Sequence, residues 1–444
     1  MDVRARRIHN RGLFLAISDL PSQQDVPSVY AVQYGMRQIE VPVKQRKNSH
    51  NILISLSMAK YLLLPSFMVN IKVQHGQIKL GPAVAIYALK FPGERIFGPQ
   101  TRLFIDLTKI ARSQGVDVFV VTPGQFDYDN QRAIGYRYDI ATARWRRQYC
   151  PWPDVVIRRV TSRPARYRTV MEEDDRILAD WTNQATLPRE LSDKWLLHEV
   201  MQHDPILSGY MLPTYLLKRP EDIIPVVSKL HDIYVKPVRG TQGLKIARVM
   251  ATDYGLEFRK QSQSDKGAPV ISPQNLVKRM RAWFAGDQTF IAQRTVLLMK
   301  TLEGRPFDVR YLVQRDGDTI ACTAQIARIG VSDALTTNIH TGAVAMDAAS
   351  LTPSLRDKDQ QAYQQGIETG KTAAMRAFFA LTKLHPILME LGVDVAIDEA
   401  GRAFVLEVNP CPGRQMLRTV SSSLRMLSLL RMVEYAVFST EFRI

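Results

Sequence analysis

Apolar and polar positions alternate most regularly near the C-terminal end of the chain. Residues 392–397 and 403–409 both have the period-two pattern of a β-strand, and the polar loop between them ends in Gly401. This pattern predicts a β-hairpin. The first strand places Asp394 on the face opposite its apolar residues, which are Val393, Val395 and Ile397.

The return strand is predicted to place Glu407 and Asn409 on one face. On its other face we expect Phe404, Leu406 and Val408. Two carboxylates and one amide oxygen would then converge across neighbouring strands. Such oxygens in an apolar segment favour a hard divalent cation with phosphates attached, and Mg²⁺ is the first candidate. The alternative is an exposed strand face that happens to carry acids.

Shorter patterns predict the elements of the first half of the chain. Residues 1 to about 92 are β-rich, with strands expected at 30–34, 39–43 and 69–73. A helix at 103–111 and strands at 116–121 and 154–158 follow, which is typical of an α/β layer.

The second half mixes helices and strands. Ser192 or Asp193 is a natural N-cap for a helix that runs to about residue 203, and a second helix begins at Glu221. We expect strands at 234–238, 245–249, 290–296 and 307–313, and a long helix at 359–391 that Pro386 could break.

Composition describes an ordinary globular protein with a surplus of positive charge. The 444 residues are 45% hydrophobic and 23% charged, with a net charge of +16. Basic residues are dense between Arg144 and Arg168. This balance favours anionic partners, although the absence of any nucleic-acid-binding motif makes nucleic acid the less favoured one.

The sequence contains no apolar run of the roughly 20 residues that a membrane helix needs. The three cysteines, Cys150, Cys322 and Cys411, are sparse and odd in number, which fits a reducing cytosol. We therefore expect a cytoplasmic protein without a membrane span.

A glycine loop follows the strand that carries Lys236. Gly240, Thr241, Gln242 and Gly243 could let backbone N–H groups approach phosphate oxygens, and Lys236 would add a positive charge. The loop lacks the Gly-Lys-Ser/Thr ending of a Walker motif, and a tight hairpin turn is an equally good interpretation.

A third group of polar residues comprises Arg310, Arg328 and Asn338. Arginine suits bidentate contact with phosphate or carboxylate, and an asparagine can orient an oxygen. Taken singly, each of these residues is better explained by a surface ion pair or a loop cap.

The order of these groups along the chain resembles the ATP-grasp superfamily, and within it the YheC/YheD-type group described as endospore coat-associated. The resemblance covers most of the chain and is strongest over residues 190–415. It is carried by residues 79–82, 97–99, 305–310, 337–338 and 407–410.

The resemblance implies an α/β (α+β) chain in which an ATP-grasp fold is preceded by an α/β pre-ATP-grasp domain and a small N-terminal β-rich module. The expected boundaries are 1–92 for the module, 93–185 for the pre-ATP-grasp domain, 186–430 for the ATP-grasp domain with its lid at about 205–292, and 431–444 for a C-terminal helical tail.

The resemblance also implies residue roles. Lys194 and Lys236 would hold the α- and β-phosphates of ATP, and Gly240 to Gly243 would form the lid over the triphosphate. Gln293, Arg294 and Val296 would belong to the hinge that meets adenine. Arg310 and Arg328 would stabilise the transferred phosphoryl group, and Asn338 would help to place it. Asp394, Glu407 and Asn409 would bind magnesium.

The implied function is an ATP- and magnesium-dependent carboxylate–amine ligase that works through an acyl phosphate and is associated with sporulation or the endospore coat. Its partners would be ATP, a carboxylate and an amine, with an acidic acceptor favoured by the basic surface, and spore-coat proteins. Two alternatives stay open: a non-catalytic or nucleotide-binding coat protein, and an ATP-grasp kinase that acts on a polyanion.

Overall fold

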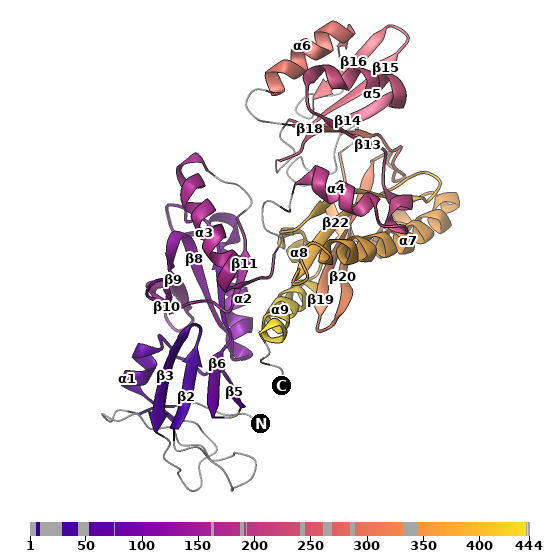
Figure 1. Cartoon of the computed structure of the whole chain (residues 1–444). Helices are drawn as coiled ribbons and strands as arrows, with labels where there is room; N and C mark the ends of the chain where they lie inside the picture. The colour runs from indigo at the N-terminus through magenta and orange to yellow at the C-terminus, as the bar shows by residue number, and fades with distance from the viewer. Residues whose placement is uncertain are drawn as a thin grey trace. The chain divides into compact units, whose positions relative to one another are not determined.

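The computed structural model describes residues 6–8, 29–42, 53–74, 76–160, 164–186, 191, 193–239, 245–260, 269–284, 289–331, 344–440 and 442. The chain forms two compact units, whose elements are labelled in Figure 1. Unit 1 comprises residues 1–186, 315–318 and 427–444, and unit 2 comprises residues 187–314 and 319–426. The domain boundaries expected from the sequence stay predictions.

Unit 1 contains a four-stranded sheet in the order β3-β2-β6-β5 and a six-stranded sheet in the order β10-β9-β8-β7-β11-β12. The strands of the first sheet are β2 (Val29–Tyr34), β3 (Arg37–Pro42), β5 (Asn70–Gln74) and β6 (Gln77–Gly81). Those of the second are β7 (Ala83–Tyr87), β8 (Asp117–Asp127), β9 (Arg132–Asp139), β10 (Arg144–Pro151), β11 (Val155–Arg158) and β12 (Asn183–Gln184). A short parallel pair joins β1 (Arg6–Ile8) to β4 (Leu53–Ser55).

The helices of unit 1 are α1 (Leu56–Tyr61), α2 (Thr101–Ser113) and α3 (Arg168–Trp181), and α9 (Ser422–Ser439) contributes its residues from Leu427 onward. One hydrophobic cluster joins the two sheets, because Tyr34 and Leu80 of the smaller sheet pack with Phe119 of β8 and Met171 of α3. All five residues of β7 are buried, as expected for a central parallel strand that is covered on both faces.

Unit 2 contains a six-stranded antiparallel sheet in the order β13-β18-β14-β15-β16-β17. Its strands are β13 (Thr214–Leu217), β14 (Asp232–Pro237), β15 (Ala247–Thr252), β16 (Gly255–Lys260), β17 (Val270–Ile271) and β18 (Phe290–Arg294). One face packs against α5 (Ile223–Leu230) and α6 (Pro273–Trp283) through Val227, Leu276 and Phe258. The other face carries the side chains of Lys236 and Gln293, since strand side chains alternate between faces.

The second sheet of unit 2 has five strands in the order β21-β20-β19-β22-β23. They are β19 (Phe307–Asp316), β20 (Thr319–Ile329), β21 (Val344–Asp347), β22 (Glu390–Ile397) and β23 (Ala403–Asn409). The long helix α7 (Asp357–Thr382) covers one face, and α8 (Gln415–Val420) packs over part of the other. The remaining helix, α4 (Lys194–Gln202), contacts α7 and β23.

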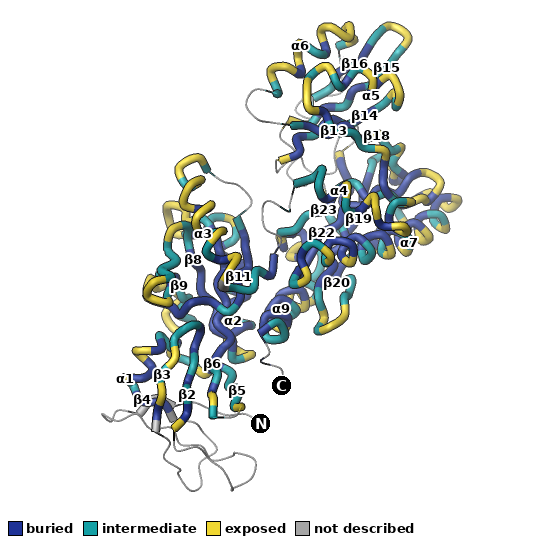
Figure 2. The backbone as a smooth tube through the Cα atoms, viewed as in Figure 1, coloured by how far each residue is buried: buried dark blue, intermediate teal, exposed yellow. Residues whose placement is uncertain are grey.

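All eight residues of β22 are buried, and Figure 2 shows this strand as a dark segment inside unit 2. Among the described residues, no helix combines the length and the apolar character that crossing a lipid bilayer requires.

Two local predictions need correction. The long helix ends at Thr382 and not near Leu391, and a turn containing Pro386 leads into β22, which begins at Glu390. A β-bulge shifts the register of the predicted hairpin, so that Asp394 pairs with Glu407 but Val395 pairs with Val405. The core face of β23 therefore consists of Ala403, Val405 and Val408, and neither Phe404 nor Leu406 is buried in it.

Candidate functional site

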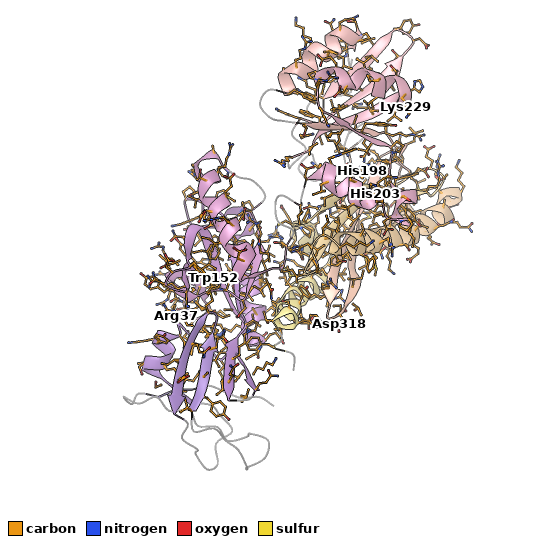
Figure 3. All side chains as sticks on the ribbon, viewed as in Figure 1. Arg37, Trp152, His198, His203, Lys229 and Asp318 are labelled. Carbon is orange, nitrogen blue, oxygen red and sulfur yellow. The ribbon has the colours of Figure 1, made fainter. Side chains whose placement is uncertain are left out.

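A cavity lies between α4, β23 and the open face of the six-stranded sheet of unit 2. Its apolar lining includes Leu197, Met201, Met211, Ile291, Val405 and Val408. Its polar lining includes Lys194, His198, Thr214, Lys236, Gln293 and Glu407. Figure 3 labels His198 on α4. An apolar chamber with a few convergent polar groups is the usual form of a small-molecule site.

Lys194 is the first residue of α4, and its position is fixed by the helix cap. The Asp193 carboxylate accepts hydrogen bonds from the backbone N–H groups of Trp195 (2.9 Å) and Leu196 (3.3 Å). The Lys194 Nζ then lies 3.4 Å from Glu407 Oε1 on β23. Residues far apart in sequence thus form a contact between ammonium and carboxylate at the cavity wall.

Lys236 extends from β14 toward its neighbour β18. Its Nζ donates a hydrogen bond to Gln293 Oε1 (2.8 Å), and Gln293 Nε2 donates to Thr214 Oγ1 on β13 (3.3 Å). Burial lowers the pKa of Lys236; Glu407 and Asp394 act to raise it, whereas Lys194 lowers it further. Burial has the largest effect, so the pKa of Lys236 lies below its ordinary value.

Three charged side chains form a row across adjacent strands of the five-stranded sheet. Arg310 of β19 pairs with Asp394 of β22, which pairs in turn with Glu407 of β23. Arg310 donates to Asp394 through Nε to Oδ1 (2.6 Å) and through a terminal nitrogen to Oδ2 (2.7 Å). This bidentate geometry is the strongest form of a pair between arginine and carboxylate.

Arg328 also contacts Asp394, and it comes from β20, the strand next to β19. Both its Nε and a terminal nitrogen donate to the Asp308 carboxylate, each at 2.6 Å, and a terminal nitrogen lies 3.0 Å from Asp394 Oδ2. Burial acts to lower the pKa of Arg328, but Asp308 and Asp394 outweigh it and the pKa rises.

Burial alone would raise the pKa of Asp394, but Arg310 and Arg328 reverse the shift and hold this pKa at about 2. Asp394 is therefore ionised throughout the physiological pH range, as a metal-binding or phosphate-orienting carboxylate must be.

The oxygens of Asp394, Glu407 and Asn409 are of the chemical kind that magnesium binds, and Asp394 and Glu407 lie opposite each other on β22 and β23. Asp394 Oδ1 accepts one hydrogen bond, from Arg310, and a carboxylate oxygen has room for a second partner. Glu407 is partly exposed, and Asn409 Oδ1 accepts from the backbone N–H of Cys411 (3.2 Å). Two carboxylates and an amide leave the remaining positions to water and phosphate, which is how Mg²⁺ is commonly held.

Across the described ranges, no three His, Cys, Asp or Glu side chains cluster closely enough to hold a metal without other ligands.

Other residues expected at the site lie elsewhere or outside the described residues. Arg294 is exposed, and its backbone N–H donates to the carbonyl of Pro213 (2.9 Å). Of the predicted site residues that the structure describes, Lys194, Lys236, Gln293 and Glu407 line the cavity, whereas Arg294, Val296, Arg310, Arg328, Asp394 and Asn409 do not. The predicted lid residues Gly240, Thr241, Gln242 and Gly243, together with Asn338, lie outside the described residues.

Sequence reasoning missed three side chains that the structure adds. Asp308 holds Arg328, and its position two residues before Arg310 on the same strand face was an available signal. Thr214 and His198 reach the cavity from β13 and α4. No short-range pattern marks these two, because their neighbours in the cavity are distant in sequence.

Comparison with known proteins gives one family and several relatives. The family described as YheC/D-like ATP-grasp matches residues 183–438. The endospore coat-associated protein YheD of Bacillus subtilis (strain 168) is 23% identical over 438 residues, which cover 95% of this chain and 93% of YheD. The endospore coat-associated protein YheC of the same organism is 22% identical over 322 residues, which cover 71% of this chain and 86% of YheC.

Among solved structures, the crystal structure of D-cycloserine synthetase DcsG is similar with a TM-score of 0.47 and 15% identity. The match covers 80% of this chain and 99% of that one.

Proposed function

The chain belongs to the YheC/D-like ATP-grasp family, and from this premise we propose that it is an ATP- and magnesium-dependent carboxylate–amine ligase. The observation that carries the proposal is that Lys194, Lys236 and Glu407 line one cavity, with Lys194 Nζ 3.4 Å from Glu407 Oε1. The apolar end of this cavity would receive the base and the charged end the phosphates. Because two relatives are described as endospore coat-associated, the protein would be associated with sporulation or the endospore coat.

The two lysines would bind the α- and β-phosphates. Their charges would neutralise phosphate oxygens that otherwise repel an approaching carboxylate, and phosphoryl transfer depends mainly on such neutralisation and on positioning. Gln293 would fix the direction of the Lys236 ammonium through their 2.8 Å hydrogen bond. Asp394, Glu407 and Asn409 would hold magnesium, which neutralises charge on the triphosphate when bound.

Arg310 and Arg328 would stabilise the phosphoryl group in transfer. An oxygen of the acceptor carboxylate attacks the γ-phosphorus, the bond from that phosphorus to the bridging oxygen of ADP breaks, and an acyl phosphate forms. The amine then attacks the acyl carbon, phosphate leaves with the former carboxylate oxygen, and the nitrogen loses a proton. Neither step requires a protein nucleophile, so positioned cations are sufficient.

ATP affinity measured by calorimetry with and without Mg²⁺ tests this function. Wild type should bind ATP in a magnesium-dependent manner, and Glu407→Gln should weaken that binding by about tenfold or more, because metal-site substitutions commonly cost this much. Glu399→Gln, in the exposed turn of the same hairpin, is the matched control and should bind like wild type. Absent or magnesium-independent binding by wild type would overturn the proposal.

Product analysis separates the ligase from its alternatives. With mixtures of acids and amines, a ligase releases both ADP and phosphate, whereas a kinase releases ADP and leaves the phosphate on its acceptor. ATP binding without any ADP release across the mixtures would favour a non-catalytic coat protein.

A further inference from the structure

The arginine-rich stretch that begins at Arg144 has no role in the proposed function, and its arginines have different surroundings in the structure. Arg158 and Arg159 are buried at the end of β11. Arg158 pairs with Asp175, and Arg159 Nε donates to Gln100 Oε1 (3.1 Å). These arginines serve the fold of unit 1. Three others, Arg144, Arg146 and Arg147, lie on β10.

β10 is an edge strand. All eight of its residues pair with β9, and within the described part of the chain no strand pairs with its other edge. Five of its residues are exposed: Arg144, Arg146, Arg147, Gln148 and Tyr149. An edge of this kind presents backbone N–H and C=O groups that can accept another extended chain.

The edge is cationic on both faces of the strand. Arg144 and Arg146 share one face and Arg147 the other, because strand side chains alternate. Asp139 pairs with Arg146 (2.9 Å), whereas Arg147 donates to the neutral side chain of Gln125 (2.8 Å). The strand itself carries no acidic residue. The local charge is therefore positive even after the ion pair is counted.

An aromatic ring extends this surface toward the end of the strand. The side chain of Tyr149 is 49% exposed, and the guanidinium of Arg132 lies 4.1 Å from the centroid of its ring. The ring offers apolar contact area beside the charges.

The charges decide which occupant fits. A second copy of β10 paired with the first would bring arginines close to arginines, and like charges across a strand pair are destabilising. An extended segment rich in Glu or Asp would instead place carboxylates beside the arginines while its backbone pairs with the free edge. We propose that β10 docks an acidic peptide segment by strand addition.

Arginines on an edge also prevent aggregation between edges. That effect is compatible with the proposal, because the same charges that repel a second copy attract an acidic strand. The proposal does not depend on the ATP-dependent function, since β10 lies in unit 1 and the cavity is lined by residues of unit 2.

The test measures binding of fluorescent peptides to the full chain by anisotropy at moderate salt. The probe is an acetylated peptide of alternating Glu and Val. One control peptide replaces every Val with Pro, which keeps the charge but removes backbone donors; another replaces every Glu with Lys. We expect binding of the Glu-Val peptide alone, and protection of β10 amides from hydrogen exchange when it is bound.

Charge reversal at β10 should weaken this binding strongly. The triple variant Arg144→Glu, Arg146→Glu and Arg147→Glu should bind at least about tenfold more weakly, and the corresponding triple Gln variant should show an intermediate loss. The matched control reverses three exposed charges of α2 in the same unit, Arg102→Glu, Lys109→Glu and Arg112→Glu, and should bind like wild type.

Three results would overturn the proposal: equal binding of the Pro-containing peptide, equal weakening by the α2 control variant, or unchanged binding by the β10 Glu variant. Tighter binding of a single-stranded oligonucleotide than of the peptide would overturn it as well, because the edge would then be a general polyanion surface. Circular dichroism of each variant shows that loss of binding does not come from unfolding.

Discussion

Asp308 and Arg328 form an ion pair that is almost fully buried, with side chains 4% and 5% exposed. Such a pair is costly to break, since removal of one partner leaves the other charge without compensation in the interior. Arg328 keeps a second contact, to Asp394, but Asp394 is already shared with Arg310.

We therefore expect Asp308→Ala to lower the free energy of unfolding by about 3 kcal/mol, as measured by urea denaturation. Glu173→Ala removes a partner from an exposed ion pair with Arg176 and serves as the control, with no measurable change expected. If both substitutions lowered the free energy of unfolding equally, burial of the pair between Asp308 and Arg328 would not be what makes its loss costly.

The low pKa of Asp394 predicts a specific pH dependence of stability. Its pKa of about 2 in the folded chain lies below the ordinary value of 3.8, so the ionised carboxylate stabilises the fold above pH 4 and loses this effect as the pH falls toward 2. Wild type should exceed Asp394→Asn by about 2 kcal/mol at pH 7. The difference should shrink near pH 2 in denaturant titrations; a difference that stays constant would show that the charge of Asp394 contributes nothing.

Lys236 should titrate below the ordinary lysine pKa of 10.5, because burial disfavours its charged form. If this lysine binds phosphate, ATP affinity should decrease as the pH rises and Lys236 loses its charge. The decrease should occur at a pH lower than 10.5. Lys236→Arg should remove this fall, since a guanidinium keeps its charge there. Identical pH profiles for the two proteins would exclude Lys236 as the titrating group.

Among the elements, the bulge in β23 has the largest consequence for the site. A regular strand with Val408 in the core would also place Leu406 there and Val405 on the opposite face. Leu406 is the extra residue of this bulge, because Asp394 pairs with Glu407 and Val395 pairs with Val405. Val405 and Val408 can therefore both pack in the core while Glu407 stays opposite Asp394. Bulges commonly re-aim side chains beside functional sites in this way.

The close contact between α7 and β19 depends on a glycine. A Cβ at Gly370 would lie 2.5 Å from the hydroxyl oxygen of Tyr311, which is fully buried and donates to the carbonyl of Ile367 (2.9 Å). Alanine is otherwise the better helix former by about 1 kcal/mol. We expect the steric conflict to prevail and Gly370→Ala to destabilise the fold by about 1–3 kcal/mol in thermal or urea unfolding.

Gly209→Ala is the matched control for this substitution, because a Cβ there meets no atom within 4 Å. It should not lower the free energy of unfolding. A stabilising effect of Gly370→Ala would mean that helix propensity outweighs the packing of Tyr311.

For the whole molecule, the division into two units predicts where a bound nucleotide acts. All residues that line the cavity belong to unit 2. With ATP and Mg²⁺, amides of β14, β18, β22 and β23 should exchange hydrogen more slowly, because a ligand stabilises the state that binds it. Amides of β7, β8 and β11 in unit 1 should be unchanged. Mass spectrometry of exchanged peptides checks both expectations.

The sequence by itself determined the hairpin of β22 and β23, the presence of acids opposite its apolar residues, and the family resemblance that the match to residues 183–438 confirms. Alternation and turn glycines are local properties, and Gly401, with φ of 77°, adopts the left-handed backbone that such a turn requires. Local rules therefore sufficed to find Asp394 and Glu407.

Tertiary structure alone decided which side chains share these carboxylates. The contacts of Lys194 with Glu407, and of Arg310 and Arg328 with Asp394, join different strands and helices. Strand pairing and helix packing select such partners over long sequence separations, and no periodicity encodes that selection. The same holds for the bulge at Leu406, which the alternation of apolar and polar residues in β23 did not predict.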